Sequence, residues 1–128
     1  MINRTHRFHG RASVQRLYKN GKMVRSGSFS LRFTLNPRRD SYRLAIVVSR
    51  KVSKSAVVRN RIRRRVYEHV RVMFGSTPIP YDLLITVFDE DVAILQAPEL
   101  AYEVNKLLKK SKLTTPISNG RAIVEHRN

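Results

Sequence analysis

The stretch AVVRNRIRRRVYEHVRVMF, residues 56–74, decides the fold because its apolar residues recur at the spacing of one face of a helix. That apolar stripe consists of Val58, Ile62, Val66, Val70 and either Met73 or Phe74. Gly75, followed by Pro78 and Pro80, is a combination that commonly ends helices. The pattern predicts one long helix at about 56–74 that packs its apolar stripe against a core.

Segments with the pattern of β-strands lie on both sides of this helix. Residues 28–35 alternate between apolar and polar side chains, with Phe29, Leu31, Phe33 and Leu35 on one face, which predicts a half-buried strand. Residues 43–49 are a β-branched apolar run of the kind found in interior strands. Because residues 36–40 read as a turn, we expect strands 28–35 and 43–49 to pair as a hairpin. Residues 82–88 predict another buried strand.

Two shorter amphipathic helices complete the pattern. Residues 12–19 place Val14, Leu17 and Tyr18 at helical spacing. Asn20 and Gly21 follow, and these residue types supply the positive φ that ends many helices. Residues 97–110 contain the stripe of a last helix, formed by Leu100, Val104, Leu107 and Leu108.

The predicted order of elements is α-β-β-(β)-α-β-α, which counts one optional strand. The candidate for it is a short strand around residues 23–24, ahead of strand 28–35, with a bulge or bend at Gly27. We expect an α+β fold whose helices pack on a small, mainly antiparallel sheet. The length of 128 residues suits one domain, at 1–111. Residues 112–128 show no sustained period and are expected to form a loosely ordered C-terminal tail.

The composition is strongly basic, with 26 Lys and Arg against 9 Asp and Glu, a formal charge of +17 and an isoelectric point near 11.4. This excess favours binding to a polyanion, above all nucleic acid, over a merely solvated basic surface. The absence of cysteine excludes disulfides and thiolate zinc sites, and the four histidines are not grouped with carboxylates. The apolar runs are too short for a membrane span, and the N-terminus lacks the pattern of a secretory signal. Both observations favour a cytoplasmic protein with no membrane partner.

The cations are densest between residues 50 and 65, a segment without any acidic residue. They are Arg50, Lys51, Lys54, Arg59, Arg61, Arg63, Arg64 and Arg65. Several lie near the start of the long helix, where the macrodipole disfavours each positive charge by roughly 0.3 to 1 kcal/mol. Phosphate groups would make the same arrangement favourable, because helix N-terminal amides and arginines both bind phosphate oxygens. A solvated charge run is the alternative, and Asn60 could be a surface filler or a polar contact to RNA.

The segment RKVSKSAVVRNRIRR, residues 50–64, resembles the signature segment of the bacterial ribonuclease P protein family. The family pattern is a basic pair, a Lys and an Ala leading into Arg-Asn-Arg, then a further basic pair and a Glu, which is Glu68 here. The resemblance covers roughly residues 4–112. Outside the signature it rests on an early Arg with a large apolar neighbour (Arg7 and Phe8) and on an aromatic helix. It also rests on a strand that begins with Arg43 and a strand that begins with Asp82.

The resemblance implies a protein subunit that binds the ribonuclease P RNA and the 5′ leader of precursor tRNA. The side chains that it implies for contact with the catalytic RNA are Arg50, Lys51, Lys54, Arg59, Asn60, Arg61, Arg63, Arg64 and Arg65. A cleft between the sheet and the first helix would receive the leader, lined by Arg7, Val14, Tyr18 and Arg32. Aromatic and guanidinium faces suit unpaired bases, although periodicity alone favours core packing for Tyr18.

Three positions depart from the family pattern. Val14 stands where the family usually has a cleft Phe, Arg32 where an aromatic is common, and Tyr67 where an Arg is frequent. The family fold also implies a left-handed β-α-β crossover, an exception to the strong right-handed rule. The resemblance further implies a monomeric protein that binds one RNA.

The implied holoenzyme is an endoribonuclease that matures the 5′ end of tRNA by hydrolysing one phosphodiester bond. Mg²⁺ ions held mainly by the RNA would activate water and stabilise the leaving oxygen. We therefore expect the protein to supply positioning and charge, with no catalytic residue and no metal ligand of its own.

Three other functions fit parts of the sequence. Asp89, Glu90 and Asp91 could hold two metal ions as in protein nucleases, although consecutive residues at a strand end point in different directions. A structural RNA-binding protein of ribosomal type fits the composition and the α+β pattern equally well, and only the signature segment separates it. DNA binding is weakest, because no helix-turn-helix spacing precedes the basic helix.

Overall fold

The computed structural model describes residues 11–75 and 79–113. Its helices and strands lie where the sequence patterns predict them. In chain order the elements are α1 (Arg11–Asn20), β1 (Lys22–Ser26), β2 (Phe29–Leu35), β3 (Arg43–Val48), α2 (Ala56–Phe74), β4 (Tyr81–Val87), the short 3₁₀ helix η2 (Glu90–Ala93) and α3 (Ala97–Ser111). The bounds of α2 are those predicted from its apolar stripe. The α+β fold class is confirmed, and the bracketed strand is real and longer than expected.

The strands form one sheet in the order β1-β2-β4-β3. β1 pairs with β2, and β2 with β4, in antiparallel fashion, whereas β3 and β4 are parallel. The sheet is therefore mainly antiparallel, as expected. α2 connects β3 to β4, because parallel neighbours need a crossover connection. The left hand of this crossover remains an expectation from the family resemblance.

The predicted hairpin between residues 28–35 and 43–49 is wrong, because β4 lies between β2 and β3. β4 is apolar on both faces, and Leu83, Leu84 and Ile85 are all buried. A strand buried on both faces is stabilised by a hydrogen-bonded partner on each side, so β4 takes the interior position. β3 is an edge strand and not the interior strand that its β-branched run predicted; Ala45 and Val47 on one of its faces are only half-buried.

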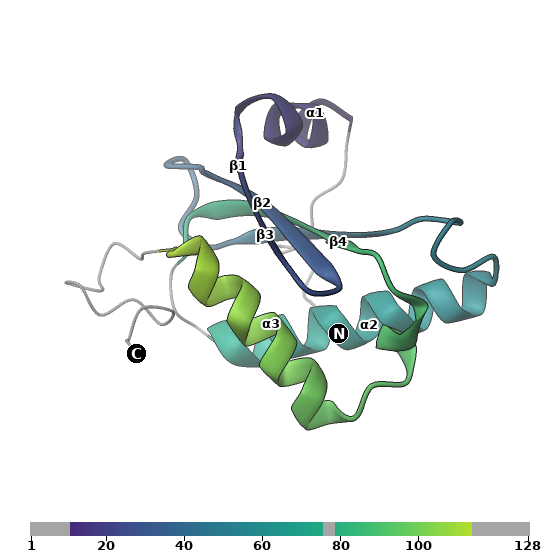
Figure 1. Cartoon of the computed structure of the whole chain (residues 1–128). Helices are drawn as coiled ribbons and strands as arrows, with labels where there is room; N and C mark the ends of the chain where they lie inside the picture. The colour runs from purple at the N-terminus through teal and green to yellow at the C-terminus, as the bar shows by residue number, and fades with distance from the viewer. Residues whose placement is uncertain (1–10, 76–78, 114–128) are drawn as a thin grey trace.

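The helices cover the two faces of the sheet unequally (Figure 1). α2 and α3 pack on one face, and α1 lies on the other. The larger core lies beneath α2 and α3, where the predicted stripe of α2 is buried through Ile62, Val66, Val70 and Phe74. On the α1 side a small second cluster joins Leu17 to Leu84, with Val14, Ala45 and Val47 partly buried around it. This lightly covered face leaves room for polar and aromatic side chains.

Among the glycines that the structure describes, two adopt a positive φ that side chains disfavour. Gly27, with φ of 57°, forms the turn between β1 and β2 and not a bulge, and Gly75, with φ of 54°, ends α2 as predicted. Gly21 does not have the positive φ that we expected of it or of Asn20. It is needed for space instead, because a Cβ there would lie 2.6 Å from the carbonyl oxygen of Leu17.

A buried charge pair ties the parallel strands together. Asp82 at the start of β4 is 2% exposed, and the Nε and Nη2 atoms of Arg43 on β3 each donate to one of its oxygens at 2.9 Å. Asn36 Nδ2 donates a third hydrogen bond at 3.2 Å. The hydrogen bond to Asp82 raises the pKa of Arg43. Because Arg43 and Asp82 are register partners, the pair fixes the alignment of β3 on β4.

The C-terminal end of the domain extends slightly past α3. Lys112 has the left-handed φ and ψ of a helix cap, and Leu113 is buried in the core at 2% exposure. The rest of the predicted tail, residues 114–128, lies outside the described residues. Within the described ranges every helix is too short or too polar to cross a bilayer.

Candidate RNA-binding surfaces

Two serines, and no acidic residue, cap and support the start of α2. Ser55 is the N-cap, and its hydroxyl accepts a hydrogen bond from the amide of Val58 at 3.2 Å. Ser53 is buried, and its hydroxyl accepts from the amide of Ser55. The first turn contains no Asp or Glu. Neutral capping leaves the positive end of the helix dipole uncompensated, which suits an anionic ligand.

Six of the predicted RNA-binding side chains are exposed around this helix start. They are Arg50, Lys51, Lys54, Asn60, Arg61 and Arg64. Among the described residues, the five cations of this set have no hydrogen-bond or ion-pair partner. Together the six residues form what we call the α2 basic surface. Its cations can therefore bind phosphate oxygens without first breaking a hydrogen bond or ion pair within the protein.

The other three arginines of the predicted set are tied to the protein. Arg59 Nη1 donates to the carbonyl oxygen of Ser53 at 2.9 Å, and Arg63 Nη1 donates to the Asn60 side chain at 2.6 Å. Arg65 Nη1 donates to the carbonyl oxygen of Val92 at 2.7 Å, and its Nη2 donates to that of Leu95. Arg65 thereby fastens the segment containing η2 to α2, which gives this predicted RNA contact a structural role.

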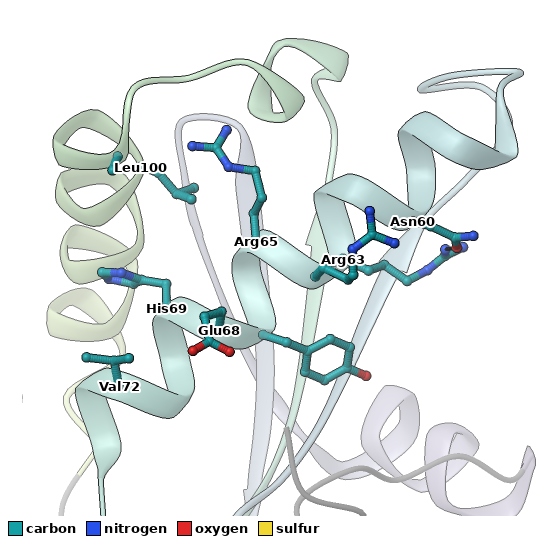
Figure 2. A pocket seen from close by; sticks show the side chains of 10 residues that line it. Asn60, Arg63, Arg65, Glu68, His69, Val72 and Leu100 are labelled. Carbon is teal, nitrogen blue, oxygen red and sulfur yellow. Dashed lines mark hydrogen bonds between the residues drawn. The ribbon is translucent and has the colours of Figure 1, made fainter. Parts of the chain in front are cut away.

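A hollow of about 740 Å³ continues this surface along α2 toward α3. Its lining comprises Asn60, Arg63, Arg64, Arg65, Tyr67, Glu68, His69, Val72, Ala97 and Leu100. Figure 2 shows Asn60 and Arg63 at one end, and His69, Val72 and Leu100 at the other. Sequence reasoning missed His69, whose Nε2 lies 3.4 Å from Asn105 Oδ1 on α3. Arg71 donates a hydrogen bond to Glu68, and this is the largest of the interactions that lower the pKa of that carboxyl to about 2.

The predicted leader cleft lies on the α1 side of the sheet. Tyr18 is 49% exposed on α1, so it is not a core residue, and the Arg32 guanidinium carbon lies 4.5 Å from its ring centroid. Val14 is partly buried beside this pair. The structure thus brings Val14, Tyr18 and Arg32 to one face, whereas Arg7 lies outside the described residues. A guanidinium stacked on a phenol ring offers a flat platform for an unpaired base.

The departure at Tyr67 has a structural explanation. Its hydroxyl donates to the carbonyl oxygen of Leu44 at 3.3 Å, which links α2 to β3. An arginine at this position would have to place its charge against the same carbonyl or in solvent. Tyr67 therefore lines the hollow with its ring and anchors the helix with its hydroxyl.

The acidic run after β4 does not form a metal site. Asp89 caps η2, since its Oδ1 accepts from the amide of Asp91 at 2.9 Å. In residues 11–75 and 79–113 no group of three or more His, Asp or Glu side chains gathers closely enough to hold a metal ion. The described donors therefore do not fit a protein-held Mg²⁺ site. The surfaces present exposed cations and an exposed aromatic ring, which are groups suited to binding phosphates and stacking on bases.

Comparison with known proteins points in one direction. The sequence model of the family described as Ribonuclease P matches residues 2–112. The chain is 34% identical over 116 residues to the ribonuclease P protein component of Synechococcus sp. (strain JA-2-3B'a(2-13)), covering 88% of this chain and 86% of the relative. It is also 34% identical over 117 residues to the ribonuclease P protein component of Chloroflexus aggregans, covering 90% and 84%.

The fold resembles that of a solved protein whose name places it in the same family. The structure of the RNase P protein of Staphylococcus aureus matches with a TM-score of 0.74 and 27% sequence identity, covering 84% of this chain and 96% of that one. This chain therefore combines the signature segment, the α+β order and the two surfaces with a fold like that of the Staphylococcus aureus protein.

Proposed function

This chain belongs to the ribonuclease P protein family, and from that membership we propose that it binds the ribonuclease P RNA through the α2 basic surface and the 5′ leader of precursor tRNA through the face beside α1. Family membership supports a role in tRNA 5′ processing as the protein component of ribonuclease P. The two RNA contacts, their residues and the stoichiometry of one protein to one RNA are parts of the proposal.

The cations of the α2 basic surface carry the first half of this proposal. Arg61 and Arg64 are exposed on α2, and Lys51 and Lys54 are exposed in the loop that precedes it. Bringing such cations together at a helix start costs stability unless anions neutralise them. RNA phosphates supply these anions, and each neutralised phosphate also releases counterions, which favours binding.

The Tyr18–Arg32 stack carries the second half. Both groups are on the sheet face that α1 covers only in part, and neither ring nor guanidinium is sealed into the core. Single-stranded RNA is recognised mainly by stacking of splayed bases on aromatic and guanidinium planes. A leader lacks a pairing partner, so its bases are available for such stacking, whereas the duplex regions of tRNA are not.

The proposed division of labour leaves the chemistry to the RNA. Mg²⁺ bound mainly by the RNA supplies the activated water and the stabilisation of the leaving oxygen. The protein's own residues bind phosphates, orient the leader and reduce repulsion between the two RNAs. We place this activity in the cytoplasm, where the precursor tRNA would be processed.

Cleavage of a labelled precursor tRNA at low Mg²⁺ tests the proposal. Three reactions are compared: ribonuclease P RNA alone, this protein alone, and both together. We expect cleavage by the RNA alone to be weak, stimulation by the protein, and no cleavage by the protein alone. Absence of stimulation would favour a structural RNA-binding protein, and cleavage by protein alone would show that protein residues perform the chemistry.

A further inference from the structure

A second guanidinium–aromatic stack lies on the sheet face that holds Tyr18 and Arg32. The Arg25 guanidinium carbon lies 4.1 Å from the ring centroid of Phe88. Arg25 is exposed on β1, and Phe88, directly after β4, is 44% exposed. An aromatic ring left half in solvent under a guanidinium has not been used to complete the core, which makes it available to a ligand.

The register of the strands places both stacks on one face. Arg25 pairs with Ser30, which is two residues from Arg32 on β2, so these three side chains point to the same side. The amide of Phe88 donates to the carbonyl oxygen of Ser28 at 2.8 Å, which continues the β2–β4 ladder past its last paired residues. Phe88 therefore keeps the alternation of β4 and lies on the side of Leu84 and Thr86.

The spacing of the stacks suits a single strand of RNA. Arg32 is the register partner of Leu84, and Phe88 lies four residues farther along the chain. At about 3.3 Å per residue this separates the stacks by about 13 Å. At the stacked rise of about 3.4 Å per nucleotide, the gap spans about four nucleotides, and fewer if the strand is extended.

The floor between the stacks is polar, and its far end is acidic. Thr86 is only partly buried in the gap, and its hydroxyl can bond to a phosphate or ribose oxygen, whereas its register partner Ser30 is buried. Asp89, Glu90 and Asp91 follow Phe88 and are all exposed. Their negative charges repel a phosphate backbone, so a strand that reaches Phe88 is disfavoured from continuing past it.

We propose that Arg25 and Phe88 form a second stacking site for unpaired nucleotides of the precursor leader, and that the acidic residues 89–91 end the track. This inference rests on the proposed function, because it extends the leader-binding face beyond Tyr18 and Arg32. The ligand is single-stranded RNA of a length set by the distance between the stacks. Sequence preference is expected to be weak, since stacking accepts every base.

The test uses the assembled holoenzyme and a series of precursors whose leaders are lengthened one nucleotide at a time, with mature tRNA as the reference. Phe88→Leu removes the aromatic face but keeps an apolar side chain, and Arg25→Gln is a second variant should Phe88→Leu fold poorly. Tyr18→Leu reports on the first stack. Tyr102→Leu is the matched control, because Tyr102 is 63% exposed on α3 with Lys106 5.8 Å above its ring, on the opposite side of the sheet.

We expect Phe88→Leu and Arg25→Gln each to weaken binding of long-leader precursors by about fivefold and to leave mature tRNA unaffected. The losses at Phe88 and at Tyr18 should set in at leader lengths that differ by up to about four nucleotides. In a Glu90→Gln, Asp91→Asn double variant, which keeps the Asp89 cap, affinity should go on rising with longer leaders.

Two results would overturn the inference. If Tyr18→Leu shows leader-dependent loss while Phe88→Leu and Arg25→Gln behave like Tyr102→Leu, the second site is wrong and the proposed function stands. If none of these variants distinguishes precursor from mature tRNA, the leader-binding face itself is wrong and the second site fails with it.

Discussion

Arg61 and Arg65 are one helical turn apart on α2, yet their surroundings differ. Arg61 is exposed, whereas Arg65 donates to two backbone carbonyl oxygens in the segment 92–95. From the sequence both were equivalent members of a basic run. The difference depends on where the chain after β4 returns to α2, and periodicity in the helix contains no information on that contact.

Replacing these two arginines should therefore affect different properties, namely RNA affinity for Arg61 and stability for Arg65. Arg61→Ala is expected to weaken binding of the ribonuclease P RNA by roughly tenfold, because one charge-assisted hydrogen bond is removed, with unchanged stability. Arg65→Ala should instead lower the free energy of unfolding by about 1 to 3 kcal/mol, because two carbonyls lose their donor. RNA titrations and urea unfolding of both variants measure this. Equal loss of RNA affinity in both, with equal stability, would contradict the assignment.

Tyr18 should report on the leader and not on folding. Because its ring is half exposed, Tyr18→Ala removes little buried area and is expected to cost less than about 1 kcal/mol of stability. Its effect on the holoenzyme should be weaker binding of precursor tRNA by about fivefold or more, with mature tRNA unchanged. Leu17→Ala is the contrasting variant, since Leu17 is buried against Leu84 and its truncation should destabilise the fold. Equal losses for precursor and mature tRNA would contradict a leader contact by Tyr18.

The positions of the helices and strands were predictable from the sequence, and the pairing of the strands was not. The stripe of α2 and the alternation of β2 are local signals, so the bounds of both elements followed closely from the sequence. The position of β4 between β2 and β3 is not local, and the nearest-neighbour hairpin was the wrong choice. The apolar residues on both faces of β4 were the available sign that it needs two partners.

The Arg43–Asp82 pair is expected to hold this non-local pairing in register. Asp82→Asn leaves the Arg43 guanidinium, which is 21% exposed, without its countercharge, and should lower the free energy of unfolding by about 2 to 4 kcal/mol. Asp40→Asn is a matched control, since Asp40 is exposed in the loop before β3. Urea unfolding at neutral pH measures both. A difference of less than about 0.5 kcal/mol between the variants would contradict the role of the pair.

At the scale of the whole molecule, charge is separated by segment. Residues 50–65 contain eight cations and no acid, whereas residues 89–103 contain five of the nine acidic residues and no Lys or Arg. The basic segment precedes and begins α2, and the acidic one covers η2 and the first half of α3. Because η2 packs against α2, the negative charges border the basic segment and should disfavour RNA phosphates on that side of it.

The salt dependence of assembly tests where the phosphates lie. Removing a side chain that binds one phosphate should flatten the plot of log affinity against log salt by about 0.7 to 0.9. We expect this change for Lys51→Ala and Arg64→Ala, and none for Lys109→Ala, which removes an exposed cation from α3. An equal change in slope for all three would mean that only net charge matters and that RNA phosphates do not bind at the α2 basic surface.

We infer that this protein makes the holoenzyme prefer RNA with a leader. The measurement that tests this preference is the ratio of affinities for precursor and mature tRNA, determined for the ribonuclease P RNA with and without the protein at the same salt and Mg²⁺ concentration. We predict that adding the protein raises this ratio, and that Tyr18→Ala removes most of the rise. An unchanged ratio, with both affinities raised equally, would show that the protein contributes only charge and would contradict the claim.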